Sequence, residues 1–408
     1  MNSTVSVLNI HLHGNLIGTL TNVGGDRSLF GLDDRYIENE NRDTLSYSLK
    51  DEFGDLITDF KPVQKKVMPL FSNLLPEGHL RKYLAEKAGI NEEREFFLLQ
   101  ALGQDLPGAI TALEAGAGGE VHKTAFDKVE PHNAEPSSTL RFSLAGVQLK
   151  FSAIQDNRQG LTIPIAGRGG NWIVKLPSRD FEGVPENEFS MMTLAAQIGI
   201  DVPEIDLVDI NSIAGLPTGI EHRGQKAFVI QRFDRLGDGS ALHIEDFAQV
   251  FGVYPDDKYK KASMRNIAYV VAAESTDDDV AELIRRVVFN VLIGNGDMHL
   301  KNWSLIYPDR RHAALAPAYD FVSTIPYTKN DAAALNVSRT KRFSEFTTDE
   351  IAHMASKAAI PEKFTLDIAA ETIALFHEHW ASEKNNLPLG RNVRDAIDNH
   401  IKRVPIAN

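Results

Sequence analysis

The sequence predicts an α+β fold in which a small β-rich lobe is followed by a larger helical lobe, with a further α+β subdomain before both. From residue 1 to about residue 60, apolar and polar side chains alternate between Gly-rich turns, which is typical of short antiparallel strands. Strand-like segments return after residue 139, and apolar residues recur at helical spacing from residue 244 onward. Residues 116–138 are polar and rich in Gly and Pro, which indicates an exposed connection. We therefore expect an N-terminal subdomain (1–115), a linker (116–138), a small lobe (139–243) and a helical large lobe (244–408).

Local signals place the elements within these parts. Pro76 begins one helical pattern, and Asn91 precedes another that we expect it to cap. The expected strands of the N-terminal subdomain are Val5–Leu12, Asn15–Leu20, Thr44–Leu49 and Ala109–Leu113. In the small lobe we expect strands at Trp172–Leu176 and Ala227–Phe233, with a helix at Glu186–Gly199 between them. The expected helices of the large lobe are Ile244–Phe251, Met264–Ala273, Asp279–Ile293, Thr348–Ala359, Leu366–Lys384 and Arg391–Lys402.

Composition excludes several classes of protein. The chain has 408 residues, of which 43% are hydrophobic and 24% charged, as in ordinary globular proteins. It has no cysteine, so disulfides and thiolate metal sites are excluded. We expect a cytoplasmic location without signal peptide or membrane span, because the first residues lack a basic, apolar leader and no apolar run is long enough. The net charge of −13 means that any contact with nucleic acid needs a local basic patch or a basic partner.

The segment Asn295-Gly-Asp-Met-His-Leu-Lys-Asn302 carries the strongest chemical signal. Asp297 and Asn302 are five residues apart, and Asp320 follows a predicted hairpin. This order matches the catalytic loop and metal-binding acid of a protein-kinase-like active site. One carboxylate there orients the attacking hydroxyl, while an amide oxygen and a second carboxylate hold Mg²⁺ against phosphates. The alternative is a solvated loop, since Asp, Asn and Gly are common in loops.

Other residues fit the same site, each with an alternative. Lys175 lies in a predicted strand, where a kinase needs a lysine for the nucleotide phosphates, and Glu186 or Glu188 could hold it; strand lysines otherwise face solvent. The segment 145–148, with Lys150, could cradle phosphates with its backbone, or be an ordinary hairpin loop. The segment 231–235 could be the hinge that contacts adenine, or a charged turn.

Nine segments, in this order, give the chain a specific likeness: Phe71–Glu77, Gly103–Ala109, Ser143–Lys150, Ile173–Pro177, Glu186–Glu188, Gln231–Arg235, Glu245–Gln249, Asn295–Asn302 and Pro317–Asp320. The set resembles the HipA family of serine/threonine kinase toxins from bacterial type II toxin–antitoxin modules. The chain departs from the family pattern at Gln231, where a glutamate is usual, and at Val147 and Leu149, where Ala and Glu are usual. Residues 255–260 match only in part.

The resemblance implies a protein-kinase-like fold of two lobes and assigns the site. Asp297 would be the catalytic base, Asn302 and Asp320 would ligate Mg²⁺, and Ser143 would be autophosphorylated, which expels the phosphate loop and switches the kinase off. The implied ATP-binding residues are Ala145, Gly146, Val147, Gln148, Leu149 and Lys150 of the phosphate loop, Lys175 with Glu186 or Glu188 in support, Gln231, Arg232 and Phe233 of the hinge, and His299, Lys301 and Tyr319.

The resemblance also implies partners. These are a helix-turn-helix antitoxin like HipB, operator DNA reached only through that antitoxin, and a protein substrate, for which aminoacyl-tRNA synthetases are the family precedent. We therefore expect an ATP- and Mg²⁺-dependent serine/threonine protein kinase that acts as a toxin and, with its antitoxin, as a corepressor. Two alternatives stay open: a catalytically silent corepressor that only binds an antitoxin, and a small-molecule or lipid kinase, since those enzymes also use Asp-x-x-x-x-Asn loops.

Overall fold

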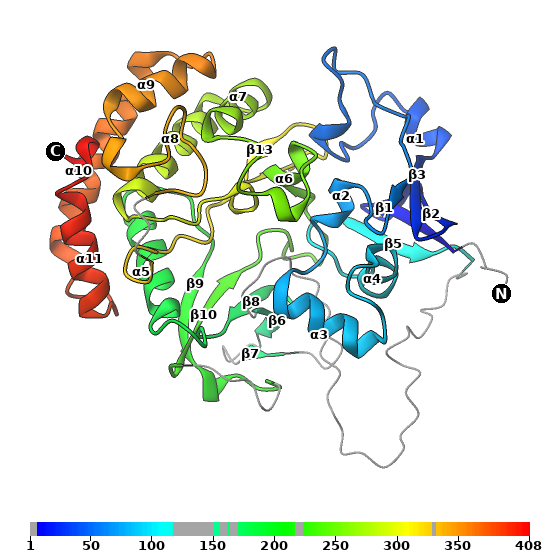
Figure 1. Cartoon of the computed structure of the whole chain (residues 1–408), viewed down its shortest axis with the longest axis horizontal. Coiled ribbons are helices and arrows are strands. Elements are labelled where there is room, and N and C mark those ends of the chain that lie inside the picture. Colours follow the sequence, from blue (N-terminus) through cyan, green and yellow to red (C-terminus); the bar gives the residue numbers. More distant parts are fainter. Residues whose placement is uncertain (1–5, 117–149, 156–160, 164–169, 217–222, 329–331) are drawn as a thin grey trace.

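The computed structural model describes residues 6–116, 150–155, 161–163, 170–216, 223–328 and 332–408. These residues form three sheets and the helices around them (Figure 1). Figure 1 shows the N-terminal subdomain, in blue and cyan, on the opposite side of the molecule from the C-terminal helices, in orange and red. The predicted α+β, kinase-like fold is confirmed by this arrangement and by a solved structure described below.

The N-terminal subdomain contains an antiparallel sheet in the order β4-β3-β2-β1-β5. Alternate residues of β1 are buried, which is why this segment forms a strand with one face on the core. The strands are β1 (Val7–Leu12), β2 (Asn15–Gly24), β3 (Arg27–Leu32), β4 (Val63–Gln64) and β5 (Ile110–Glu114). The helices are α1 (Asp34–Glu38), α2 (Pro69–Ser72), α3 (Gly78–Ala88) and α4 (Glu95–Leu102).

Two local predictions for this subdomain are wrong. The segment 44–49 is not a strand but ends in a short 3-10 helix, Tyr47–Leu49, because the hydroxyl of Ser46 accepts a hydrogen bond from the Ser48 amide at 3.1 Å. Asn91 does not cap a helix. Its side chain accepts a bond from the Glu93 amide at 2.8 Å and stabilises a turn, and α4 begins only at Glu95.

The small lobe has a five-stranded sheet in the order β7-β6-β8-β10-β9, with α5 packed on β10 and β9. The strand β8 lies between β6 and β10, so Lys175 at its end has a neighbouring strand on each side. The elements are β6 (Lys150–Gln155), β7 (Leu161–Thr162), β8 (Trp172–Lys175), α5 (Val184–Gln197), β9 (Ile205–Asp209) and β10 (Lys226–Gln231).

The large lobe is mainly helical. The predicted helix at 244–251 is wrong in its first residues, because Ile244–Asp246 pairs with β12 in a sheet and Asp246 caps a helix that begins only at Phe247. The Asp246 side chain accepts a bond from the Gln249 amide, and the Gln249 side chain accepts one from the Asp246 amide, each at 2.9 Å. The elements are β11 (Ile244–Asp246), α6 (Phe247–Val250), α7 (Met264–Glu274), α8 (Asp277–Leu292), β12 (Ser304–Ile306), β13 (Ala314–Leu315), α9 (Thr348–Lys357), α10 (Glu362–Glu383) and α11 (Arg391–Ile401).

Two hydrophobic cores meet at the small-lobe sheet. In β10, Ala227 and Val229 pack into the core of the N-terminal subdomain, while Phe228 and Ile230 pack into the core of α5 and the large lobe. Successive strand residues point to opposite faces, so this one strand joins both cores. The N-terminal subdomain is therefore packed directly on the sheet that carries Lys175.

No helix in the part of the chain that the structure describes is both long and apolar enough to cross a membrane. The cytoplasmic location itself stays a prediction.

Candidate active site

The loop 294–302 begins where α8 ends. Gly294 takes a left-handed conformation with φ of +66°, and a Cβ there would lie 2.7 Å from the side chain of Ile325. Glycine is needed at this point for both its backbone conformation and its lack of a side chain. The Gly296 amide then donates to the Thr324 hydroxyl at 2.7 Å, which fixes the loop against the segment that follows Asp320.

Hydrogen bonds inside the loop orient Asp297 and Asn302 toward each other. The Asn295 side-chain oxygen accepts a bond from the Asp297 amide at 3.0 Å. The Asn302 side-chain nitrogen donates to the Asp297 carbonyl at 2.8 Å. Since the nitrogen of the Asn302 amide is used in this way, its oxygen is the atom that can face a cation. The five-residue spacing that the sequence predicted to be catalytic therefore corresponds to a direct contact.

The carboxyl of Asp297 is held from a distant part of the chain. The Tyr259 hydroxyl donates to Oδ1 of Asp297 at 3.0 Å, and the Tyr259 and His299 rings pack nearly perpendicular with their centroids 5.0 Å apart. Burial by surrounding protein raises the pKa of Asp297, and the bond from Tyr259 opposes that shift. Tyr259 is not among the predicted site residues and lies in the segment 255–260, which matches the family only in part.

Lys175 is the centre of a buried charge cluster. Its Nζ donates to Oε1 of Glu188 at 2.5 Å and also to Oδ1 of Asp320. Of the two helix glutamates that the sequence left open, Glu188 therefore makes the ion pair. Glu186 lies two residues away on the same helix, and residues at that spacing face different sides. The alternative for Lys175, a strand lysine facing solvent, is excluded because the residue is buried.

Asp320 has an unusual backbone. Its φ is +59°, in the left-handed region that non-glycine residues rarely adopt. The Asn295 side chain donates to the Asp320 carbonyl at 3.4 Å, so the catalytic-loop candidate and this acid are linked. Such conformations are concentrated at functional sites, where the surrounding structure holds them. This backbone directs the Asp320 carboxylate back toward the strand lysine.

The charges in this cluster shift one another's pKa values. Burial would raise the pKa of Asp320, but Lys175 and Lys150 outweigh it and lower that pKa to about 2. Burial raises the pKa of Glu188 to about 7, since the one lysine beside it is shared with Asp320. Lys150 lies opposite Lys175 in the β6–β8 pairing, and burial lowers its pKa to about 8. Asp320 is thus ionised at neutral pH and faces two amino groups.

The remaining predicted ATP-site residues that the structure describes lie around this cluster. The Tyr319 hydroxyl contacts the Ser304 hydroxyl at 2.5 Å, and its ring lies 6.0 Å from the Phe233 ring. His299 is buried, and burial lowers its pKa to about 3, so it is neutral. The ammonium of Lys301 points to the N-terminal subdomain, 2.9 Å from the Asn73 carbonyl.

The hinge candidate ends strand β10. Gln231 is exposed, while the buried guanidinium of Arg232 is paired with Asp234 at 2.8 and 2.9 Å. The Arg232 side chain therefore fixes the turn after the strand. Six predicted site residues lie outside the described residues: Ser143, Ala145, Gly146, Val147, Gln148 and Leu149.

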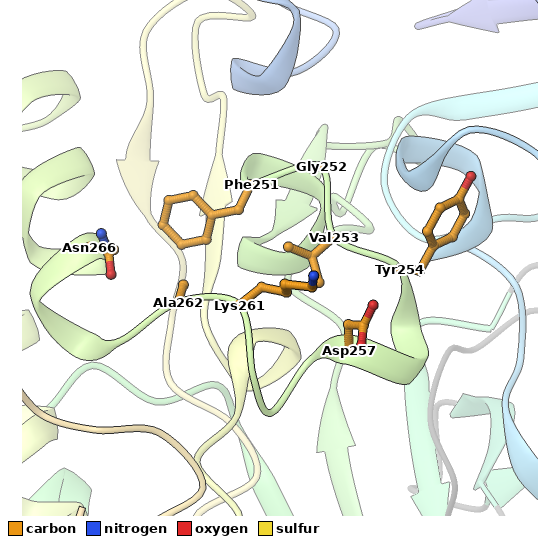
Figure 2. Close-up of a pocket in the computed structure, with 8 residues that line it drawn as sticks. All are labelled: Phe251, Gly252, Val253, Tyr254, Asp257, Lys261, Ala262 and Asn266. Carbon is orange, nitrogen blue, oxygen red and sulfur yellow. The ribbon is translucent and has the colours of Figure 1, made fainter. Parts of the chain in front are cut away.

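A pocket of about 530 Å³ lies beside the loop that carries Tyr259. Figure 2 shows Phe251 and Asn266 on one side of it and Tyr254 on the other, with Lys261 between them. Its lining does not include Asp297, Asn302 or Asp320, so this pocket is separate from the charge cluster.

Comparisons with known proteins show the family to which the chain is similar. A family model described as the HipA N-terminal domain matches residues 8–113, and one described as the HipA-like C-terminal domain matches residues 142–380. The candidate kinase Y4dM of Sinorhizobium fredii is 54% identical over 411 residues, which cover 98% of each chain. A second candidate kinase of that organism, Y4mE, is 30% identical and covers 88% of this chain and 87% of its own.

More distant relatives include a named toxin. The serine/threonine-protein kinase toxin HipA of Shewanella oneidensis is 28% identical over 287 residues, 62% of each chain. A chain of the solved Shewanella oneidensis complex of HipA, HipB and operator DNA superposes with a TM-score of 0.71, covers 97% of this chain and 95% of its own, and is 21% identical. At that identity the match shows the fold alone.

The fold defines the class: this is a protein with a kinase-like fold, in which Lys175 pairs with Glu188 and Asp320. The two family models together match most of the chain, and the C-terminal one alone matches more than half. The chain belongs to the HipA family. The prediction of family from the nine sequence segments is confirmed.

Proposed function

We propose that this chain is a serine/threonine protein kinase that transfers a phosphoryl group from ATP, with Mg²⁺, to a protein hydroxyl. The observation that carries the proposal is the position of Lys175, which joins Glu188 and Asp320 beside the loop of Asp297 and Asn302. In protein kinases a strand lysine held by a helix glutamate contacts the nucleotide phosphates, and an acid that follows the catalytic loop holds the metal. Support also comes from relatives that are named as kinases.

The donor atoms fit Mg²⁺ with a nucleotide. Asp320 offers a carboxylate and Asn302 an amide oxygen, the hard ligands that Mg²⁺ prefers. Mg²⁺ usually takes one or two protein carboxylates and completes its shell with phosphate and water oxygens, so a cage made of protein alone is not needed. When bound, Mg²⁺–ATP supplies the phosphoryl group and a metal that offsets its negative charge.

The protein's own residues then have separate roles. The Asp297 carboxylate, oriented by Tyr259, holds the acceptor hydroxyl and accepts its proton. Lys175 and Lys150, paired across neighbouring strands, bind phosphate oxygens. Glu188 keeps Lys175 in place when the carboxylate of Asp320 turns to a cation instead of the lysine.

The same proposal includes a toxin–antitoxin role. The partner is a helix-turn-helix antitoxin like HipB, and the protein substrate belongs to the translation machinery, with an aminoacyl-tRNA synthetase as the first candidate. The support is that one relative is named as a toxin and that a structural neighbour was solved with HipB and operator DNA.

The first prediction concerns DNA. Because the net charge is −13, we expect no sequence-specific DNA binding by the chain alone at physiological salt. A basic antitoxin must supply the phosphate and base contacts. Gel shifts with the operator next to its own gene, with and without the antitoxin, measure this. A specific shift by the purified chain alone contradicts the prediction.

A second prediction concerns Ser143, which precedes the phosphate-loop candidate by two residues in the sequence. A phosphate there carries roughly −1.5 to −2 charges at neutral pH and repels the phosphates of ATP. We expect incubation with Mg²⁺–ATP to phosphorylate Ser143 and to weaken ATP binding. Phosphosite mapping and calorimetry before and after incubation measure both effects, with Ser143→Ala as the control. Full phosphorylation of Ser143 with unchanged ATP affinity refutes self-inactivation.

The test of the function itself compares proteins phosphorylated in cells. Wild type and Asp297→Asn are induced to the same level, and phosphopeptides are quantified by mass spectrometry. The expected result is a small set of seryl or threonyl sites present only with wild type. If no site differs while the antitoxin still binds, the chain is a silent corepressor. If only a small molecule or lipid is phosphorylated, it is a kinase of another class.

A further inference from the structure

Glu77 is a half-buried residue of the N-terminal subdomain, and its carboxylate faces the large lobe. It directly precedes α3 and ends the family-like segment 71–77, to which no role was assigned. Its Oε2 accepts a hydrogen bond from Nζ of Lys258 at 2.8 Å, and its Oε1 lies 2.9 Å from Nζ of Lys301. Both lysines are buried. One carboxylate thus neutralises two ammonium groups that belong to a different part of the fold.

Each lysine is next in sequence to a residue that contacts Asp297. Lys258 precedes Tyr259, whose hydroxyl donates to the Asp297 carboxyl at 3.0 Å. Lys301 precedes Asn302, whose side chain donates to the Asp297 carbonyl at 2.8 Å. Two series of contacts therefore lead from Glu77 to Asp297. One passes through Lys258 and Tyr259 to the Asp297 carboxyl. The other passes through Lys301 and Asn302 to the Asp297 carbonyl.

Further bonds tie the same segments together. The Leu300 amide donates to the Lys258 carbonyl at 3.4 Å, so the two lysine-bearing segments also touch each other. Nζ of Lys301 donates to the Asn73 carbonyl at 2.9 Å, and the Asn73 side chain donates to the Val253 carbonyl at 2.8 Å. The segment from Asn73 to Glu77 thus connects the loop before Tyr259 with the loop that carries Asp297.

The charges of Glu77, Lys258 and Lys301 explain why loss of the Glu77 carboxylate should disturb this region. Burial would raise the pKa of Glu77, but Lys301 and Lys258 outweigh it and lower that pKa to about 2. The carboxylate is therefore ionised at neutral pH. A neutral side chain in its place leaves two buried ammonium groups with poor compensation, and such groups move toward solvent or other acids. Asp246, whose Oδ2 is 3.6 Å from Nζ of Lys301, is the acid within reach of that lysine.

We propose that Glu77 is a positioning residue for phosphoryl transfer, which fixes Asp297 and Asn302 through Lys258 and Lys301. The N-terminal subdomain is then part of the catalytic apparatus, because it supplies the one carboxylate shared by both lysines. The kinetic part of this inference rests on the proposed kinase function. The structural part, that Glu77 orders the loop 295–302, does not depend on it.

The test compares two charge-removing variants at the boundary between the N-terminal subdomain and the rest of the chain. Glu77→Gln keeps the size of the side chain and removes its charge. Glu274→Gln does the same at another ion pair of this boundary, in which Oε2 of Glu274 lies 2.7 Å from Nζ of Lys50. Among the described residues, the Glu274 side chain makes no hydrogen bond or ion pair with the loop 295–302, with Lys258 or with the segment 231–235. Thermal unfolding, Mg²⁺–ATP affinity, kcat, KM for ATP and hydrogen exchange of residues 295–302 are measured for both.

For Glu77→Gln we expect kcat to fall about 10- to 100-fold, because a small displacement of a catalytic group has an effect of that order. KM for ATP should change less than kcat, since Lys175, Glu188 and Asp320 are untouched and only Asn302 of the proposed metal ligands loses support. Hydrogen exchange of residues 295–302 should become faster. For Glu274→Gln we expect some loss of thermal stability with near-normal kcat and unchanged exchange in that loop.

A double variant separates positioning from simple stability. Glu77→Gln with Lys258→Met removes one uncompensated ammonium, so we expect thermal stability to recover while kcat stays low. Recovery of kcat together with stability overturns the proposal, as does normal loop exchange in Glu77→Gln. If wild type itself transfers no phosphoryl group, the proposed function fails, and the exchange measurement still decides whether Glu77 orders the loop.

Discussion

Asp297→Asn is expected to lower the rate of phosphoryl transfer by about 10²- to 10⁴-fold, the usual effect of losing a general base. The variant should fold normally. An amide oxygen can still accept the bond from Tyr259, and the bond from Asn302 goes to the backbone carbonyl of Asp297, which does not change. Mg²⁺–ATP affinity should remain close to that of wild type, because Lys175 and Asp320 keep their contacts. Single-turnover assays with a hydroxyl-bearing peptide or with autophosphorylation measure the rate.

The control is Asp367→Asn, an exposed acid on α10 that pairs only with the neighbouring Lys363 among the described residues. It should be as active as wild type. Near-normal turnover of Asp297→Asn would remove Asp297 from the role of base and leave it as a structural member of the loop.

The pH dependence gives an independent check on Asp297. The base must be ionised, and burial raises its pKa above the ordinary aspartate value of 3.8. Activity of wild type should therefore decline as pH falls through that raised pKa, at a higher pH than an unperturbed aspartate would give. Tyr259→Phe removes a hydrogen bond that favours the ionised form, so the decline should move to still higher pH.

The contacts that the sequence predicted join residues that are close to each other in the sequence. Asp297 and Asn302 contact each other within one loop, and their spacing alone indicates that contact. Lys175 and Glu188 are thirteen residues apart on consecutive elements, a strand and the following helix, so the sequence narrows the partner to two residues. Which of the two makes the pair depends on how α5 is rotated on the sheet, and packing sets that rotation.

The site residues that the sequence did not predict contact partners that are far from them in the sequence. Tyr259 is 38 residues from Asp297, and Glu77 is 181 residues from Lys258. Nothing in the local pattern around either residue indicates its partner. A tyrosine or glutamate near a Pro or Lys is common in any fold. Folding of the large lobe brings Tyr259 to Asp297, and packing of the N-terminal subdomain against that lobe brings Glu77 to Lys258.

Errors in the predicted elements have a similar cause. The segment 244–251 has helical spacing throughout, yet its first residues complete a sheet with β12 and its helix begins at a side-chain cap. The pairing of Ile244–Asp246 with β12, some sixty residues later, determines the structure here in spite of the local helical periodicity. The result matters for the site, because β11 places Asp246 beside Lys301.

The last prediction concerns Asp320, and its effect should be as large as that of Asp297. Asp320→Ala removes a hard oxygen ligand for Mg²⁺ and one of the two carboxylates that hold Lys175. Turnover should fall by about 10²- to 10³-fold, since a metal contributes several kcal/mol to transition-state stabilisation and about 1.4 kcal/mol is a factor of ten. ATP affinity in the presence of Mg²⁺ should fall at least about tenfold.

The most specific part of this prediction is the response to the metal. Without Mg²⁺, ATP should bind Asp320→Ala at least as well as wild type, because a carboxylate that repels phosphates is gone while Lys175 keeps Glu188. Adding Mg²⁺ should strengthen ATP binding to wild type and have little effect on the variant. Calorimetric titrations with and without Mg²⁺ measure both.

A companion variant separates the metal from the backbone. Alanine is disfavoured at a φ of +59°, so Asp320→Ala also strains the chain by about 1–2 kcal/mol, whereas asparagine tolerates that conformation. Asp320→Asn should therefore unfold at nearly the temperature of wild type and still lose most of the response to Mg²⁺, because an amide oxygen carries no full charge. If Mg²⁺ strengthens ATP binding to both variants as much as to wild type, Asp320 is not a metal ligand, and its carboxylate serves only to hold Lys175.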